Sequence, residues 1–213
     1  YDVVTWLGKT PSSYRLELSP PLFSIKKLCK APGLRALTNN ITLKTFEELG
    51  VSEEIRRAIE ELGFEHPMPV QEEVIPFLLG NGNDVIALAQ TGTGKTAAFG
   101  IPLLQRTDPT DRTTQAIVIS PTRELCLQIA DDLKSFSKYI KGINIVAVYG
   151  GTSIVDQMRA LKHGAQIIVA TPGRLIDLMH RGAAKLEAVQ NVVLDEADEM
   201  LNMGFSDSIN EIF

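Results

Sequence analysis

The sequence predicts an α/β protein whose parallel sheet is covered by helices on both faces. Short runs rich in β-branched residues alternate with longer amphipathic stretches, which is typical of strands joined by crossover helices. The runs are almost continuously apolar, and this indicates strands that are buried on both faces. They span residues 84–89, 116–120, 143–149, 166–170 and 191–195.

The composition indicates a globular protein with one large core. Of the 213 residues, 44% are hydrophobic and 22% are charged. No run approaches the roughly 20 apolar residues that span a bilayer, and no apolar secretory signal opens the sequence. We therefore expect a cytoplasmic monomer with no membrane association. Cys126 lies in a helical pattern far from Cys29, and we expect it to be a small buried apolar residue.

A change in charge marks a boundary near residue 41. Residues 1–41 contain six Lys or Arg and two acids, whereas the remainder contains fifteen and twenty-four. The first segment also holds four prolines and shows neither a helical period nor strand alternation. We predict a poorly ordered extension there. The net charge of −5 argues against strong nonspecific attraction to nucleic acid.

The regular pattern begins with a helix soon after residue 43. Ser52 is a typical N-cap residue, and Glu53 and Glu54 follow it in the first turn. Gly63 stands where a helix commonly ends.

The run at residues 84–89 leads into a glycine-rich loop and then into a helical pattern, which is the context of a phosphate-binding loop. Gly92 and Gly94 allow successive backbone N–H groups to turn toward phosphate oxygens. Lys95 is expected to reach the β and γ phosphates, and the Thr96 hydroxyl to bind Mg²⁺. The full segment is Ala89, Gln90, Thr91, Gly92, Thr93, Gly94, Lys95 and Thr96.

Two acids end the last predicted strand. Asp195 is expected to hold Mg²⁺ from the side opposite the phosphate loop, and Glu196 to orient or deprotonate an attacking water. This pair indicates hydrolysis rather than transfer to an acceptor. The other strand ends carry residues 120–123, 150–151 and 170–174, and ligands of parallel sheets bind at such ends. Five loops are therefore predicted to converge on one edge.

These motifs, in this order, resemble those of the DEAD-box RNA helicases. The segment from Asp195 to Asp198 is similar to the motif that names the family, and Gly63 to Gln71 resembles its Q motif. The resemblance covers residues 46 to 205. It implies a RecA-like P-loop NTPase fold, with a Q-motif region at residues 42–72 and ATP-binding domain 1 at residues 73–213. ATP and Mg²⁺ are the implied cofactors.

The resemblance implies that Gln71 recognises adenine. A glutamine amide can pair with the N6 and N7 edge of adenine while an aromatic ring stacks on the base. Phe46 and Phe64 are the candidate aromatics, and ordinary core packing is the alternative for both. Met68 and Val70 depart from the threonine and isoleucine that are commoner in the motif.

The resemblance also implies that three segments hold the sugar-phosphate backbone of single-stranded or duplex RNA without reading its bases. Glycines permit close approach, hydroxyl and N–H groups bind phosphates, and arginines add charge. The alternative for Thr171 to Gly173 is a plain helix cap, with Arg174 solvated or paired to an acid. The implied RNA-binding residues are Pro121, Thr122, Arg123, Glu124, Gly150, Gly151, Thr171, Pro172, Gly173 and Arg174.

By the same resemblance the domain is C-terminally truncated at Phe213. The family's Ser-Ala-Thr strand, to which Asp198 would couple, is expected between the strands of Lys95 and Asp195, so we predict a gap there. The second RecA-like domain would supply arginine fingers worth roughly 10³ to 10⁵ in rate, so this chain alone is expected to be nearly inactive. The implied whole protein is an ATP-dependent RNA helicase that opens short duplexes. The alternative is an ATP-gated RNA clamp with little unwinding.

Overall fold

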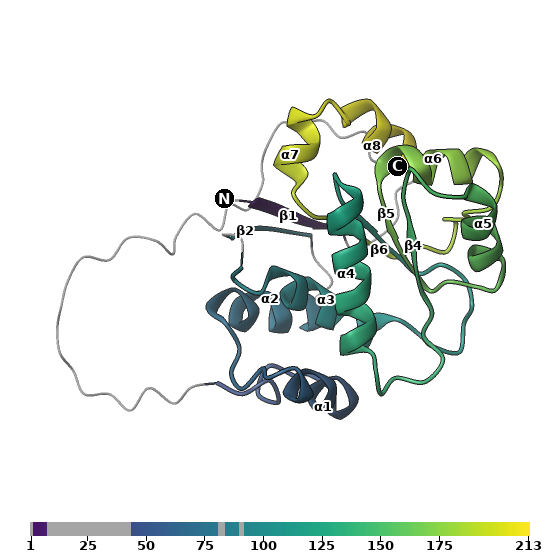
Figure 1. The fold of residues 1–213 in the computed structure, drawn as a ribbon. Coiled ribbons are helices and arrows are strands. Elements are labelled where there is room, and N and C mark those ends of the chain that lie inside the picture. The colour runs from purple at the N-terminus through teal and green to yellow at the C-terminus, as the bar shows by residue number, and fades with distance from the viewer. Residues whose placement is uncertain (1, 8–43, 81–83, 90–91) are drawn as a thin grey trace, which may run out of the picture.

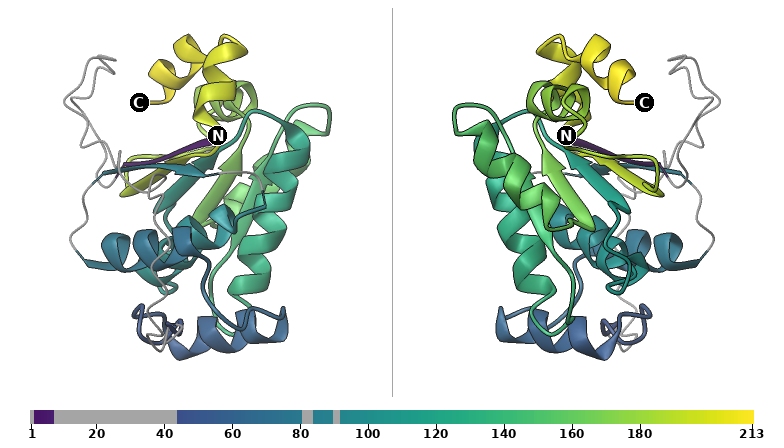
Figure 2. Two further views of the ribbon diagram at one scale, coloured as in Figure 1. Left: turned by 90° about the vertical axis from the view of Figure 1, so that its left-hand side faces the viewer. Right: turned by 90° about the vertical axis from the view of Figure 1, so that its right-hand side faces the viewer.

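A six-stranded sheet with helices on both faces organises the molecule (Figures 1 and 2). The computed structural model describes residues 2–7, 44–80, 84–89 and 92–213. The strand order is β2-β1-β6-β3-β5-β4, and β3, β4, β5 and β6 pair in parallel. The predicted α/β class is confirmed.

All five predicted strands are present. Every side chain of β3, β5 and β6 is buried, which explains why their sequences are apolar, apart from Asn191 at the start of β6, rather than alternating. These strands are β2 (Val85–Ala89), β3 (Ala116–Ile119), β4 (Ile145–Val148), β5 (Ile167–Ala170) and β6 (Asn191–Leu194).

Helices connect and flank the strands. The helix expected after Ser52 is confirmed, and Gly63 follows it with a φ of +85°, a left-handed value that favours glycine. Ser52 precedes this helix without making a side-chain capping bond. The helices are α1 (Glu53–Glu61), α2 (Pro69–Gly80), α3 (Lys95–Arg106), α4 (Arg123–Phe136), α5 (Ile154–Lys162), α6 (Pro172–His180), α7 (Ala197–Asn202) and α8 (Ser206–Ile212). Within the described ranges, none of them has the length and apolar character that a membrane crossing requires.

Two apolar clusters form the core, one on each face of the sheet. Successive residues of β3 alternate between them, with Ala116 and Val118 in the first cluster and Ile117 and Ile119 in the second. Helices α1 to α4 contribute to the first cluster, and α5 to α8 to the second. The helices therefore cover opposite faces (Figure 2).

The sixth strand, β1 (Asp2–Leu7), is the main difference from the sequence prediction. It lies between β2 and β6 and is antiparallel to both, so the gap expected between the strands of Lys95 and Asp195 is filled. The expectation of a poorly ordered extension fails for these six residues. Their short apolar run carries no sign of partners that lie far away in the sequence. The rest of that predicted extension falls outside the described residues.

Candidate functional site

The phosphate loop joins the end of β2 directly to the start of α3. Gly92 and Gly94 have φ values of +79° and +80°, which only glycine adopts without strain. Gly94 is the N-cap residue of α3, so Lys95 and Thr96 form its first turn. A helix N-terminus presents free N–H groups and a partial positive charge. The predicted anion site therefore has its expected geometry from Gly92 onward, whereas Gln90 and Thr91 fall outside the described residues.

Gln71 lies beneath this loop rather than in an open base pocket. Its side chain is 0% exposed. The Gln71 Oε1 atom accepts a hydrogen bond from the Met68 N–H at 2.9 Å, and its Nε2 donates to the Gly94 carbonyl at 3.1 Å. A Cβ atom at Gly94 would lie 2.3 Å from the same Nε2. Gln71 therefore connects α2 to the phosphate loop, a contact that the sequence analysis does not predict.

The two candidate aromatics pack with each other. Phe46 is 6% exposed and belongs to the first core cluster, and Phe64 packs against that cluster. The Phe64 ring centroid lies 6.5 Å from that of Phe46 and 5.9 Å from that of Phe136, edge-on to the latter. These are ordinary aromatic contacts of a core. Both rings therefore contribute to the packing of the first core cluster.

The acidic end of β6 has an unusual backbone. Asp195 is 3% exposed, and its N–H donates to the Ile119 carbonyl at 2.9 Å. Glu196 follows with φ 54° and ψ 47°, and it is the one non-glycine residue of the described ranges with positive φ. Such values are uncommon outside glycine, and they cluster at functional sites. Asp198 lies two residues further on, in the first turn of α7.

The oxygen donors present fit Mg²⁺. The Thr96 hydroxyl and the Asp195 carboxylate are hard ligands of the kind that this ion prefers. No group of three His, Cys, Asp or Glu in the described part of the chain could hold a metal by itself.

A pocket of about 470 Å³ opens at the carboxyl ends of the neighbouring strands. The predicted RNA-binding segments line it, except for Thr122, Glu124 and Gly151. Phe205, which directly precedes α8, completes the wall. The lining residues are Pro121, Arg123, Gly150, Thr171, Pro172, Gly173, Arg174 and Phe205. The structure thus brings together three segments that are separated in the sequence.

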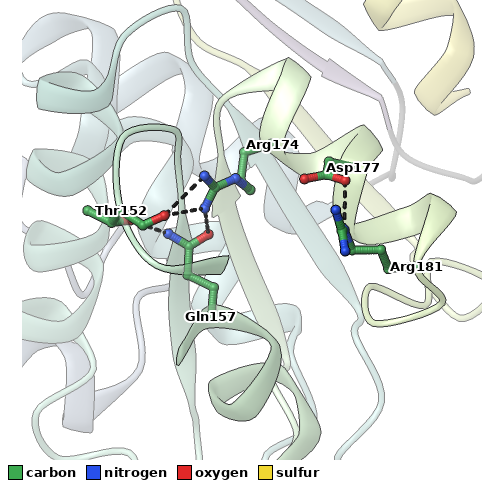
Figure 3. Close-up of polar contacts among 5 residues, drawn as sticks. All are labelled: Thr152, Gln157, Arg174, Asp177 and Arg181. Carbon is green, nitrogen blue, oxygen red and sulfur yellow. Dashed lines mark hydrogen bonds and ion pairs between the residues drawn. The ribbon is translucent and has the colours of Figure 1, made fainter. Parts of the chain in front are cut away.

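Arg174 holds the glycine loop in place, as Figure 3 shows. Its Nη1 and Nη2 atoms both donate to the Thr152 carbonyl at 3.2 Å, and Nη1 also donates to Gln157 Oε1 at 3.0 Å. Gln157 in turn donates to the Tyr149 carbonyl at 3.0 Å and to the Thr152 hydroxyl at 2.8 Å. Arg174 therefore pairs with a backbone carbonyl and an amide oxygen rather than with an acid, and it also lines the pocket. It links α6 to the loop that contains Gly150 and Gly151.

The other predicted RNA-binding residues also make contacts within the protein. The Thr122 hydroxyl caps α4 by accepting from the Leu125 N–H at 3.2 Å. The Arg123 guanidinium lies 5.0 Å from the centroid of the Tyr149 ring, within range of a cation–π interaction. Thr171 precedes α6 without a capping bond from its side chain, and the residue lines the pocket.

Several residues at this edge are missed by sequence reasoning. Thr152 and Gln157 are ordinary polar residues, and their roles arise only when α5 and α6 come together. Phe205 follows Gly204, whose φ of +80° marks the end of α7, so the sequence signal there is only that of a helix stop. Burial raises the pKa of the Cys126 thiol to about 12, which confirms an inert apolar role for that residue.

Comparison with known proteins identifies the class to which this fold and site belong. The sequence model of the family described as DEAD/DEAH box helicase matches residues 68–213. The chain belongs to this family, and its fold is RecA-like. Among curated relatives it is 52% identical to the ATP-dependent RNA helicase DeaD of Haemophilus influenzae, over 79% of this chain and 27% of that protein. It is 50% identical to the DEAD-box ATP-dependent RNA helicase CshA of Geobacillus kaustophilus, over 80% of this chain and 36% of that protein.

Solved structures of similar proteins agree with this family assignment. A DEAD box protein from Methanococcus jannaschii superposes with a TM-score of 0.70 at 43% identity, covering 79% of this chain and 46% of that one. The structure of S. cerevisiae Dbp5 bound to RNA and ADP BeF3 superposes with a TM-score of 0.68 at 34% identity, covering 79% of this chain and 42% of that one. The chain thus spans about a quarter to a third of the length of the curated relatives, and under half of the solved chains.

Proposed function

We propose that this chain is the ATP-binding, RecA-like part of a DEAD-box RNA helicase and that it binds Mg-ATP and the RNA backbone at one edge of its sheet. The observation that carries the proposal is the shared location of the two sets of residues. The phosphate loop and Asp195 lie at the carboxyl ends of β2 and β6, and the lined pocket lies at the ends of β3, β4 and β5. Family membership supports the pairing of these two ligands.

The chain's own residues divide the work on the nucleotide. Lys95 and the N–H groups at the start of α3 would hold the phosphates, while Thr96 and Asp195 would hold Mg²⁺. The ion, when bound, neutralises charge on the β and γ phosphate oxygens. Glu196, adjacent to Asp195, would orient or deprotonate the attacking water.

Gln71 would read adenine while it stays bonded to the phosphate loop. A glutamine amide has two N–H donors and two carbonyl lone pairs, and the contacts with Met68 and Gly94 use one of each. Because the side chain is 0% exposed, the remaining donor and lone pair become accessible only after α2 or the loop shifts. Recognition of the base and ordering of the loop would therefore be linked.

The RNA grip would be independent of sequence, because it relies on backbone groups. Arg174 orders the loop of Gly150 and Gly151, and Arg123 and the Thr171 hydroxyl are left to meet phosphate or sugar. None of these groups distinguishes one base from another. In the whole protein, ATP hydrolysis would be coupled to opening of short RNA duplexes.

The nucleotide assignment is tested by calorimetry with Mg-ATP and Mg-GTP. Gln71→Ala should remove the preference for ATP over GTP, because the amide that reads the base is gone. Gln128→Ala, a change to an exposed glutamine on α4, should leave the preference intact and serves as the matched control. An unchanged preference in Gln71→Ala would refute the adenine assignment.

The RNA assignment is tested by anisotropy of labelled single strands in the presence of a nonhydrolysable ATP analogue. Homopolymers of different bases should bind with similar affinity, and Thr171→Ala should weaken all of them alike. A strong preference for one base, or equal affinity of the variant and the parent, would count against this pocket.

A further inference from the structure

Strand β1 is the single sheet connection of the phosphate-loop strand. In the described part of the chain, β2 pairs with β1 alone, across five residues from Asp2 opposite Ala89 to Trp6 opposite Val85. On its other side β1 pairs with β6, where Thr5 lies opposite Leu194. Among the described strands, β2, which leads to Lys95, is therefore connected to β6, which leads to Asp195, only through β1.

We propose that β1 is a positioning strand of the nucleotide site, which sets the separation and the relative height of the phosphate loop and the acidic strand end. The proposal rests on the proposed function, since it assumes that the phosphate loop and the acidic end of β6 bind the same Mg-nucleotide. The six residues Asp2–Leu7 carry none of the motifs on which the proposed ATP and RNA sites are based.

The separation follows from strand spacing. Neighbouring strands lie about 4.8 Å apart, so β1 holds β2 and β6 about 9.6 Å from each other. Without β1, the strand β2 would either close directly onto β6 or lose its sheet partner. Either change exceeds the misplacement of about 1 Å that already impairs catalytic geometry.

The relative height follows from the register. Thr5 lies opposite Ile86 in β2 and opposite Leu194 in β6, so these two residues are level across the sheet. From that level β2 continues to Ala89 before the phosphate loop begins, whereas β6 reaches Asp195 at the next residue. At about 3.3 Å per residue, β2 therefore ends about 7 Å beyond the level of Asp195. A shift in the register of β1 against either neighbour would change this offset.

The packing of β1 shows what holds it. Val4 is 5% exposed and belongs to the first core cluster, together with Val85 of β2 and Val193 of β6. Helix α7, which follows Glu196, contacts β1 and lies above it in the view of Figure 1. The opposite edge of β2 has no strand beside it in the described ranges. β1 is therefore the element that ties β2 to the core of the sheet.

The test compares Val4→Pro with Val4→Ile in the complete 213-residue chain. Proline lacks the N–H of a central strand and disrupts pairing, whereas isoleucine keeps the shape and strand preference of valine. Hydrogen exchange is measured at residues 85–89, and Mg-ATP affinity by calorimetry. Val4→Pro should lose protection in β2 and bind Mg-ATP at least tenfold more weakly, and Val4→Ile should match the parent.

A second variant, deletion of residues 1–7, keeps the proposal testable if the proline variant is poorly folded. Retained protection in β3, β4 and β5 reports that the rest of the sheet is intact. A synthetic peptide spanning residues 1–10, added in excess, should restore both β2 protection and Mg-ATP affinity.

The outcomes separate this proposal from the proposed function. If the parent binds Mg-ATP and both variants bind it equally well, the positioning role of β1 is wrong. If the parent does not bind Mg-ATP at all, the proposed function fails. In that case the hydrogen-exchange data still test whether β1 holds β2 in the sheet. Unchanged protection of β2 in both variants would overturn the positioning role of β1.

Discussion

Gly94 is the residue where two separate constraints meet. Its φ of +80° disfavours any side chain, and a Cβ atom there would also clash with Gln71. Gly92 has almost the same φ of +79° but open space around it, so it isolates the first constraint. A comparison of the two positions therefore measures the Gln71 contact.

Gly92→Ala should lower the free energy of unfolding by about 1–2 kcal/mol, the cost of a left-handed backbone at a non-glycine residue. Gly94→Ala should lower it by a further 1–3 kcal/mol or so, because the Gln71 amide is displaced and loses a buried hydrogen bond. Urea denaturation of both variants gives the two values. Equal losses at the two positions would mean that the Gln71 contact with the loop contributes nothing to stability.

Glu196 stores backbone strain beside Asp195, the proposed Mg²⁺ ligand. Replacing it with glycine relieves that strain, whereas the same change at Glu199, which is exposed within α7, introduces glycine into a helix. Glu196→Gly should therefore be more stable than Glu199→Gly by about 1–2 kcal/mol in thermal unfolding. Equal stabilities would indicate that the φ of 54° is not strained in this protein.

At the scale of elements, α6 shows how an arginine near the start of a helix and the arginine at its C-cap differ. Arg174 joins the helix to the glycine loop through three hydrogen bonds, whereas Arg181 makes an ion pair at 2.8 Å with Asp177 on its own helix (Figure 3). The side chains of the latter pair are 51% and 44% exposed. Exposed pairs of this kind contribute at most about 1 kcal/mol.

Arg174→Ala should accordingly lower the free energy of unfolding by roughly 1.5–3 kcal/mol, because charge-assisted bonds to the Thr152 carbonyl and Gln157 are lost. It should also speed hydrogen exchange at residues 150–153. Arg181→Ala should cost less than about 1 kcal/mol and leave that loop unchanged. If the two variants behaved alike, Arg174 would not be the link between α6 and the loop.

The helices, strands and phosphate loop could be predicted from the sequence where the local pattern of apolar residues and glycines determines the structure. β3, β5 and β6 are apolar runs because both of their faces are covered, and the phosphate loop is marked by its glycines between a strand and a helix. Contacts between elements could not be predicted in this way. The bonds from Arg174 to Thr152, and from Gln71 to Gly94, depend on polar atoms that only the tertiary fold brings within reach.

β1 illustrates the same limit most clearly. A strand buried between two others must pair on both sides, and the pairing partners of Asp2–Leu7 lie near residues 85 and 193. No turn residue or alternation near the segment specifies either partner. Prolines in the following stretch instead suggest irregular structure.

At the scale of the whole molecule, the sheet separates two apolar clusters that share no helix. Ile101 in α3 belongs to the first and Ile209 in α8 to the second. Ile→Val at either position should lower the free energy of unfolding by about 0.5–1.5 kcal/mol. Since the two side chains have no common neighbours, the double variant should equal the sum within about 0.5 kcal/mol. A larger coupling, measured by denaturant unfolding, would show that the clusters behave as one core.

The position of β1 also has a consequence for the order in which the chain can fold. Residues 5–7 pair with residues 192–194, so β1, which precedes the other described strands in the sequence, cannot complete its pairing until almost all of the other described strands and helices have been synthesised. Contacts between such distant residues close late, because a long loop must be ordered first. Until then β2 has no neighbour among the described strands. The two strands that lead to the proposed nucleotide site would thus reach their final separation only after residues 192–194 have joined the sheet.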